Sequence, residues 1–371
     1  MRYYLIAGEV SGDLLGSHLA KAILGQDPQA QMRYWGGCKM NEAIGTEPVR
    51  HIRDLAIMGF VEVVRNLRTV LGNIKCCKQD ILRFKPDVVV GIDYPGFNLK
   101  IEKFAHQHGI KTVHYVSPQL WAWKKGRIKG MRRNLDRLCY ILPFEQQFYA
   151  ANAFPQAVFV GHPLLDVVAG WSEPSVSNPT ADKPIIALLP GSRKQEVGKV
   201  LPAMLRLADN HQEYSFAIAG LAMLGSDFYE AIVGNRGNVA VVYDQTYQLL
   251  SSAYAALVCS GTATLETALF GLPQVVCYAA NPISVAIARR LVGRRIKYIS
   301  LVNLIADESI ITELIQQDFS DERLEQEFDL ITNNAANRQR IAEGYSRMRQ
   351  LLGNEGASER CATQIINTCR K

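Results

Sequence analysis

Short apolar runs rich in β-branched residues alternate with amphipathic helical patterns along most of this chain, and this alternation constrains its fold most strongly. A strand of a parallel sheet is buried on both faces and is followed by a crossover helix, so it reads as a near-continuous apolar run. Amphipathic stretches such as 14–24 and 99–107 separate runs of this kind. We therefore predict parallel sheets built from βαβ units. The predicted strands are 3–7, 32–35, 88–92, 112–116, 138–142, 157–160, 185–189, 215–219, 239–243, 255–258 and 274–277.

The alternation lapses between residues 169 and 184, where Pro, Ser and Asn are frequent and periodicity is lost. Such a stretch is typical of a linker, and 371 residues are too many for one ordinary domain. We predict an α/β fold with two doubly wound, Rossmann-like domains, 1–168 and 185–345, that face each other across a cleft. Beyond residue 310 the pattern predicts helices only. The segment 346–371 is expected to pack back toward the N-terminal domain.

Several classes of protein are excluded by hydropathy and cysteine spacing. No uncharged apolar run reaches the roughly 18 residues needed to cross a bilayer, and Glu9 comes too early for a signal peptide, so we expect a cytoplasmic location. The eight cysteines include no C-x-x-C pair, which predicts reduced, mostly buried thiols and no zinc site. No Asp-x-Asp motif or P-loop is present, so the sequence offers no candidate for a metal-bridged nucleotide site.

The net charge of +6 is unevenly distributed. Basic patches suit phosphate-bearing ligands, an anionic membrane surface or nucleic acid, but solvated helix faces have the same composition. Two tryptophans precede the first patch, yet no nucleic-acid-binding module is recognisable, and we predict no nucleic-acid partner. The two patches are Lys124, Lys125, Arg127, Lys129, Arg132, Arg133 and Arg137, and Arg289, Arg290, Arg294, Arg295 and Lys297.

Two motifs in the first half follow predicted strands. Residues 8–13, with Glu9 and Asp13, lie between a strand and a helix, where small residues let backbone N–H groups approach an anionic ligand. A capped turn with Ser11 or Asp13 as N-cap would need the same residue types. Asp93 ends the strand 88–92, where ligands of open α/β sheets bind, and its carboxylate could accept a proton from a sugar hydroxyl or cap the next helix.

Two further motifs follow strands of the second half. Arg193 and Lys194 lie on a strand-to-helix loop, where a guanidinium can grip a diphosphate, or they form an exposed surface pair. The turn 260–266 combines Gly with hydroxyl residues at a helix start, which favours an anion site made of backbone N–H groups. Glu266 could bind ribose hydroxyls, although a capping box would also explain the pattern.

One more stretch, residues 55–71, has a broad apolar face interrupted by basic residues. A helix of this kind either lies in a membrane interface or is buried within a domain, and the pattern leaves both open. His114 similarly either lines the cleft or is a structural histidine with satisfied hydrogen bonds.

Taken together, these segments resemble the lipid A disaccharide synthase family of GT-B glycosyltransferases from about residue 3 to the C-terminus. Nine strings in the right order are more specific than any one of them. The strings are AGEVSGD (7–13), AIMG (56–59), GID (91–93), KTVHYVSP (111–118), WAW (121–123), ILPFE (141–145), VGHPL (160–164), LPGSR (189–193) and SGTATLE (260–266).

The resemblance implies a GT-B architecture that binds acceptor mainly in the N-terminal domain and UDP-sugar donor mainly in the C-terminal one. The implied reaction joins UDP-2,3-diacylglucosamine to 2,3-diacylglucosamine 1-phosphate and releases UDP and a β-1,6-linked disaccharide 1-phosphate. It proceeds with inversion and needs no metal or other cofactor. The implied partners are these two substrates and the inner face of the inner membrane, and a homodimer is possible.

The resemblance also implies residue roles. Asp93 matches the proposed base, and Glu9 matches an acidic residue of the same cleft. The implied donor contacts are Arg193, Lys194, Ser260, Gly261, Thr262, Ala263, Thr264, Glu266 and Asn303. The implied acceptor or cleft residues are Ser11, Gly12, Asp13, His114 and Ser117. The implied membrane or acyl-chain contacts are Met58, Phe60, Val63, Val64, Leu67 and Leu71.

Two departures from the family pattern stand out. Many members carry a second Asp where this chain has Gly96, and a second Arg where it has Lys194, which keeps the charge but loses a bidentate grip. The rival interpretations are another GT-B enzyme acting on UDP-GlcNAc, such as an epimerase or a lipid-linked transferase, and a noncatalytic protein that binds membranes or nucleic acid through its basic patches. A requirement for acyl chains on the substrate would argue against the first rival. Loss of turnover when Asp93 is replaced would argue against the second.

Overall fold

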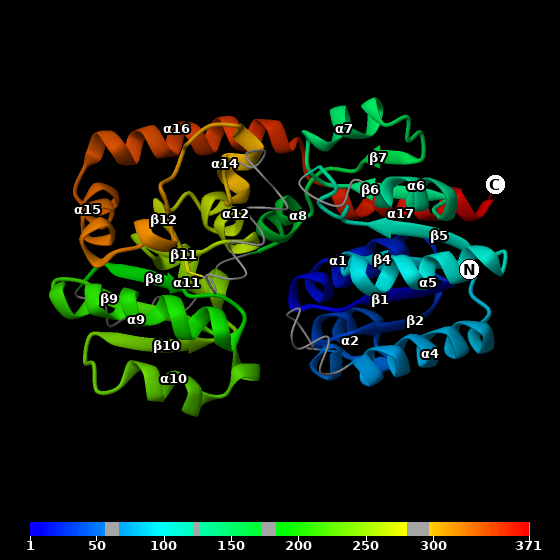
Figure 1. Cartoon of the computed structure of the whole chain (residues 1–371), viewed down its shortest axis with the longest axis horizontal. Coiled ribbons are helices and arrows are strands. Elements are labelled where there is room, and N and C mark those ends of the chain that lie inside the picture. The colour runs from blue at the N-terminus through cyan, green and yellow to red at the C-terminus, as the bar shows by residue number, and fades with distance from the viewer. Residues whose placement is uncertain (56–66, 122–125, 172–182, 280–296, 371) are drawn as a thin grey trace. The chain divides into compact units, whose positions relative to one another are not determined.

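The computed structural model describes residues 1–55, 67–121, 126–171, 183–279 and 297–370. They form two compact units: Met1–Val167 together with Asn354–Lys371, and Val168–Gly353 (Figure 1). Most of the expected linker, residues 172–182, lies outside the described residues. The second unit ends at Gly353, so the boundary expected at residue 345 falls within a helix, α16 (Ala335–Leu352).

The first unit is built on a seven-stranded parallel sheet with the order β3-β2-β1-β4-β5-β6-β7. Its strands are β1 (Arg2–Ala7), β2 (Gln31–Gly36), β3 (Arg50–His51), β4 (Val88–Ile92), β5 (Lys111–Tyr115), β6 (Arg137–Tyr140) and β7 (Ala157–Phe159). Its described helices are α1 (Val10–Gln26), α2 (Cys38–Ile44), the 3-10 turn η1 (Ile52–Leu55), α4 (Leu67–Phe84), α5 (Pro95–Gln107), α6 (Arg127–Asn134), α7 (Glu145–Ala151), α8 (Leu164–Ala169, whose last residues belong to the second unit) and α17 (Ala357–Arg370).

The central strands of this sheet are buried on both faces, as their apolar sequences predict. Every residue of β4 is buried, and on one face Tyr4 and Trp35 pack with Ile81 of α4 and Ile101 of α5. The two aromatic residues also satisfy their polar atoms, since Trp35 Nε1 donates to the Tyr4 hydroxyl over 2.9 Å and that hydroxyl donates to Asp80 over 2.7 Å. The sheet is therefore a rigid frame for the loops at its carboxyl edge.

The C-terminal helix α17 is part of this first unit and packs against α1 (Figure 1). Asp166 accepts hydrogen bonds from the backbone N–H groups of Gly356 (2.6 Å), Ala357 (3.2 Å) and Ser358 (2.9 Å), and so caps the N-terminus of α17. The Arg360 guanidinium donates to the Val160 carbonyl over 2.8 Å. The last residues of the chain are thus tied to the first unit by specific hydrogen bonds.

The second unit repeats the same design with a six-stranded parallel sheet of order β10-β9-β8-β11-β12-β13. Its strands are β8 (Ile185–Leu189), β9 (Ser215–Gly220), β10 (Val239–Tyr243), β11 (Ala255–Cys259), β12 (Gln274–Tyr278) and β13 (Glu313–Ile315). Its described helices are η2 (Ala222–Leu224), α9 (Lys194–Asn210), α10 (Ser226–Val233), α11 (Thr246–Ser252), α12 (Thr262–Leu269), α14 (Leu301–Ala306), η4 (Gln316–Asp318), α15 (Asp321–Thr332) and α16.

The predicted parallel sheets are confirmed, and each predicted strand is present within a residue or two of its expected bounds. Two strands were not predicted, β3 and β13, and β13 shows that the expectation of helices only beyond residue 310 is wrong. Both are edge strands of two or three residues, too short to show a period in sequence. All eight cysteines are free and five of them are buried, as predicted.

Candidate active site

Both sheets reverse their winding direction beside the first strand of the unit, between β1 and β4 and between β8 and β11. In doubly wound sheets, ligands bind outside the carboxyl ends of the strands at this switch point. Glu9 follows β1 and Asp93 follows β4, whereas Arg193 follows β8 and Ser260 follows β11. In each unit the fold therefore brings two sequence-predicted motifs, far apart in the chain, to the position where such sheets bind ligands.

In the first unit the two loops at the switch point pack on one another. A Cβ atom added to Gly8 would lie 2.3 Å from Cδ1 of Tyr94, so only glycine lets the aromatic ring cover the turn between β1 and α1. Burial raises the pKa of the Tyr94 hydroxyl, and the nearby charge of Glu9 raises it further. Glu9, which occupies the N-cap position of α1, thus lies close to the loop that carries Asp93.

Asp93 is held in an uncommon backbone conformation, with φ of 47°, and Tyr94 follows with φ of 50°. The Asp93 N–H donates to the Tyr115 carbonyl over 2.8 Å, and the Asn98 side-chain amide donates to the Asp93 carbonyl over 2.7 Å. Residues with positive φ other than glycine cost free energy and cluster at functional sites. The alternative role as a helix cap is not observed, because Tyr94 takes the N-cap position of α5.

The Asp93 carboxyl is suited to proton transfer. Burial raises its pKa above the ordinary value, while the positive charge of His114 and a backbone hydrogen bond act in the opposite direction. A carboxylate with a raised pKa at the end of a strand is a candidate general base. The role of Asp93 as general base stays a prediction.

Three other predicted acceptor residues of this unit are buried and already have partners. Asp13 accepts hydrogen bonds from the backbone N–H groups of Gly37 (2.6 Å), Lys39 (3.1 Å) and Met40 (3.2 Å), so it caps α2, and its contact with acceptor stays a prediction. His114 is fully buried against Glu102, and Ser117 bonds to the Tyr149 hydroxyl and to the Pro118 carbonyl. Ser11 is half-buried and Gly12 buried in the first turn of α1, and their contact with acceptor stays a prediction.

The capping role of Asp13 gives a stability prediction. Replacing Asp13 with Ala should lower the free energy of unfolding by about 2 kcal/mol, because buried N–H groups at the start of α2 lose their acceptor. Urea denaturation followed by circular dichroism would measure the change. Glu42→Ala on the exposed face of α2 is the control and should change stability by less than about 0.5 kcal/mol. Equal stability of the two variants would contradict the capping role.

In the second unit, Arg193 takes the N-cap position of α9, at the carboxyl end of β8. Its side chain is about half exposed (49%), and its Nη1 donates to Glu196 Oε1 over 2.9 Å. A Cβ atom added to Gly191, which has φ of 115°, would lie 2.9 Å from Cβ of Glu196 and 3.6 Å from Sγ of Cys259. The loop after β8 thus lies close to the end of β11, the strand that precedes the turn beginning at Ser260.

Lys194 behaves differently from its neighbour. Its Nζ lies 5.2 Å from the centre of the Phe228 ring, an arrangement that favours a cation–π interaction with α10. The single guanidinium of Arg193 is therefore the cation best placed at the switch point in the described part of this loop, and donor binding by Lys194 stays a prediction.

The turn after β11 leads into α12, as the sequence predicts. Gly261 has φ of 122° and takes the N-cap position of α12, which leaves the backbone at the start of the helix uncovered by any side-chain cap. Ser260, Thr262 and Ala263 are half-buried beside it. Glu266 accepts a hydrogen bond from the Tyr247 hydroxyl over 2.8 Å, which orients its carboxylate. These features suit an anionic group bound at the start of α12.

Two predicted donor contacts belong to the scaffold of the second unit. The Asn303 side chain is fully buried; its Nδ2 donates to the Ile311 carbonyl and to Glu313, and its Oδ1 accepts from the N–H groups of Ile310 and Ile311. Thr264 is also buried, and its hydroxyl donates to the Gly261 carbonyl over 2.8 Å. Both residues support the turns around the site, and a direct contact with the nucleotide stays a prediction.

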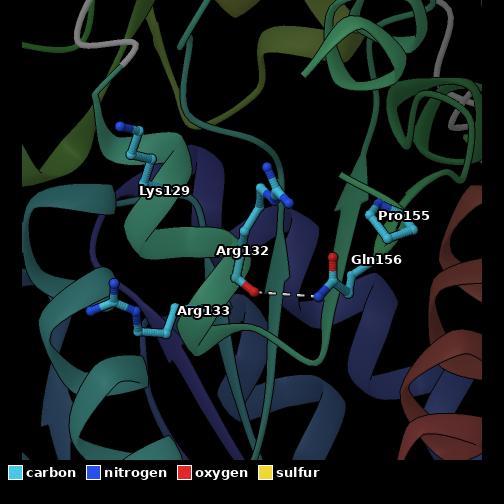
Figure 2. A pocket seen from close by; sticks show the side chains of 5 residues that line it. All are labelled: Lys129, Arg132, Arg133, Pro155 and Gln156. Atoms are coloured by element: carbon cyan, nitrogen blue, oxygen red, sulfur yellow. Dashed lines mark hydrogen bonds between the residues drawn. The ribbon is translucent and has the colours of Figure 1, made fainter. Parts of the chain in front are cut away.

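The first basic patch is partly described. Figure 2 shows Lys129, Arg132 and Arg133 extending from α6 beside Pro155 and Gln156, and these five residues line a pocket that contains no acidic residue. Gln156 donates to the Arg132 carbonyl over 3.3 Å. The predicted members Lys124 and Lys125 lie outside the described residues. So do Arg289, Arg290, Arg294 and Arg295 of the second patch, of which the described Lys297 pairs with Asp307 at 3.3 Å.

Most of the expected membrane segment lies outside the described residues. This part includes Met58, Phe60, Val63, Val64 and the side chain of Leu67. Leu71 is described and is 54% exposed on α4. Within the described ranges, no helix is long and apolar enough to span a membrane. The same ranges contain no group of three or more His, Cys, Asp or Glu side chains arranged to hold a metal ion.

The sequence did not single out several residues that build these sites, among them Asn98, Glu102 and Tyr247. Asn98 and Glu102 are four positions apart on α5 and so share one face of the helix with the apolar Ile101 and Ala105. This polar pair on the apolar face of a predicted helix is the sequence signal that could have identified both residues. Tyr247 offers no comparable signal, because its partner Glu266 is on another helix.

His162 is buried, and its Nδ1 accepts a hydrogen bond from the Leu164 N–H over 3.3 Å. Burial lowers its pKa to about 3. Because the unfolded state binds a proton near pH 6.5 and the folded state does not, this histidine favours folding above pH 6.5, and the contribution is lost as the pH falls.

We therefore expect the stability difference between the wild type and His162→Asn to shrink by about 2 kcal/mol between pH 6.5 and pH 5. Asn can still accept the Leu164 N–H bond but does not titrate. Urea denaturation of both proteins at both pH values would measure this difference. The titration of all other groups affects both proteins equally and so cancels. A pH-independent difference would mean that His162 binds its proton equally well in the folded and the unfolded state.

Two units with this strand order, each with its candidate residues at the switch point, define a glycosyltransferase fold of the GT-B class. The chain is similar to the S. aureus MnaA–UDP co-structure (TM-score 0.70, 14% identity, 100% of this chain and 98% of that chain covered). It is also similar to the glycotransferase of kitacinnamycin (TM-score 0.65, 14% identity, 99% of each chain). At this identity the likeness establishes the fold alone.

The sequence comparisons establish the family. The model described as lipid-A-disaccharide synthetase matches residues 3–366. A lipid-A-disaccharide synthase from Syntrophus aciditrophicus (strain SB) is 37% identical over 377 residues, which cover 99% of this chain and 97% of that protein. The chain belongs to the lipid-A-disaccharide synthetase family. It is a hexosyltransferase of lipid A biosynthesis that uses a UDP-sugar.

Proposed function

We propose that this enzyme transfers 2,3-diacylglucosamine from its UDP derivative to the 6-hydroxyl of 2,3-diacylglucosamine 1-phosphate, with inversion and without a required metal. The bond between the anomeric carbon and the UDP oxygen breaks as the acceptor oxygen bonds to that carbon. The hydroxyl proton passes to Asp93, and UDP leaves with the electron pair of the broken bond. The observation that carries the proposal is that Asp93 and Arg193 each occupy the switch point of their own sheet.

Each unit would supply a different part of this chemistry. The backbone of Asp93 is held by Asn98, and the raised pKa of its carboxyl makes it a stronger base than an exposed aspartate. Arg193 and the N-terminus of α12 would stabilise the charge that develops on the departing diphosphate. Glu266, oriented by Tyr247, is the group we assign to the ribose hydroxyls, and Glu9 lies beside the loop of the base.

The acylated substrates reside in membranes, so we also propose peripheral association with the inner face of the inner membrane. The exposed Leu71 on α4 and the basic residues of α6 support this proposal, since apolar and cationic groups together favour an anionic interface. A homodimer stays a prediction.

An assay of UDP release tests the proposed reaction. Purified protein in detergent should release UDP when both acylated glucosamine substrates are present, and mass spectrometry should find the disaccharide 1-phosphate. UDP-GlcNAc, which lacks the acyl chains, should give no product and no epimer. Absence of UDP release with the acylated pair, or turnover of UDP-GlcNAc alone, would overturn the proposed substrate class.

A further inference from the structure

A buried carboxyl and a buried imidazole are in contact beside β4, the strand that leads to Asp93. Glu102 of α5 is 1% exposed and His114 of β5 is fully buried, and Oε1 of the first is 2.6 Å from Nδ1 of the second. Placing two charges in a protein interior costs several kcal/mol that their attraction only partly offsets, so an apolar pair would usually be at least as stable. The pair therefore calls for an explanation beyond packing.

The fold makes specific room for this pair. A Cβ atom added to Gly91 of β4 would lie 2.2 Å from Oε1 of Glu102 and 2.9 Å from Cβ of Asn98. Gly91 is also the residue paired with His114 in the register of β4 and β5. Because Gly91 has no side chain, the Glu102 carboxylate fits against the sheet at this position, which is two residues before Asp93.

The same helix holds the backbone of Asp93. Besides its bond to the Asp93 carbonyl, the Asn98 amide donates to the Ile6 carbonyl over 3.1 Å, so it ties the loop after β4 to β1. Asn98 and Glu102 lie one helical turn apart on α5. One face of α5 therefore contacts both the backbone of Asp93 and the histidine beneath it.

The largest charge effects on His114 come from two elements of this unit. Glu102 from α5 and Asp93 from the end of β4 act on its ring, and the residue paired with it on β6 is the apolar Leu138. Burial by itself lowers the pKa of His114, but Glu102, Asp93 and a backbone hydrogen bond raise it above the ordinary value. Glu102 and Asp93 thus favour the protonated form of this imidazole.

We propose that Glu102 and His114 are positioning residues for the base: Glu102 keeps His114 positively charged, and this charge keeps the Asp93 carboxylate ionised in its buried position. The inference rests on the proposed function, since it assumes that Asp93 removes the acceptor proton. Without the charge on His114, burial would hold a proton on Asp93 to higher pH, and less of the enzyme would have a competent base.

Glu102→Gln tests the pair with little change of shape. Gln retains an oxygen that can accept from Nδ1 of His114, but it removes the charge. We expect the acidic limb of the kcat–pH profile to move up by about one pH unit, so that kcat below this limb falls about tenfold and recovers at high pH. KM for the UDP-sugar should not change. Glu42→Gln, an exposed charge change on α2, should leave the profile unaltered.

His114→Gln should shift the same limb, and the double variant should shift it no further, because both changes remove one interaction. An equal loss of kcat at all pH values would show a structural role only and overturn the proposal. The wild type provides a test that depends on no variant: nitrogen-15 NMR should show a protonated His114 imidazole at pH 7, and a neutral ring would overturn the proposal.

The outcomes also separate this inference from the proposed function. If Asp93→Asn keeps normal turnover, the assignment of the base is wrong. If Asp93→Asn is inactive while Glu102→Gln leaves the limb in place, the base stands and only the role of the buried pair fails.

Discussion

Replacing Asp93 with Asn should reduce kcat by about 10³-fold while leaving the binding of UDP unchanged, because the variant loses the group that accepts the acceptor proton. Asn has nearly the same shape and tolerates the positive φ of this position, so the loop between β4 and α5 should keep its conformation. UDP release under saturating substrates measures kcat, and calorimetric titration with UDP measures the retained binding.

Asp54→Asn is the matched control, since it removes an exposed carboxylate of the same unit outside the switch point. It should retain full activity. If Asp93→Asn turned over within tenfold of the wild type, proton removal would have to be assigned to another group. Glu9, whose charge acts on Tyr94 of the same loop, would be the next candidate.

The framework of both units could be predicted from sequence because parallel strands are buried on both faces. Strands such as β4 and β8 are apolar throughout, and their bounds are as predicted. The edge strands β3 and β13 were missed because a strand of two or three residues is specified by pairing with its neighbour and leaves no periodic signal. Propensity within so short a window carries little information.

The site could be predicted only in part, because the same residue types serve ligands and scaffold. The sequence does not show that Asp13 caps α2, because the backbone N–H groups that it binds belong to a helix that local sequence does not place beside it. Asn303 likewise meets its partners in the segment 310–313 only after folding. In contrast, Asp93 and Arg193 follow strands directly, and strand ends fix their position whatever the distant partners are.

Replacing Arg193 with Ala should reduce kcat/KM for the UDP-sugar by about 10²- to 10³-fold, because a guanidinium at the end of β8 would bind the diphosphate and stabilise its charge as it departs. Arg193→Lys should recover only part of this loss, since an ammonium cannot form a bidentate contact. Arg347→Ala, which removes an exposed guanidinium paired with Glu308 in the same unit, should have little effect.

The partner of Arg193 in the structure sharpens this test. Glu196 Oε1 lies 2.9 Å from the guanidinium, so Arg193→Ala removes a cation and also leaves a carboxylate beside the expected diphosphate. The double variant Arg193→Ala/Glu196→Gln should therefore be more active than Arg193→Ala alone, by about tenfold if the repulsion is worth about 1.4 kcal/mol. Initial rates at subsaturating UDP-sugar measure both variants. Two results together would contradict this role: no recovery in the double variant, and binding of UDP to Arg193→Ala as tight as to the wild type. The diphosphate would then have to bind away from the loop after β8, because the attraction by Arg193 and the repulsion by Glu196 act only at short range.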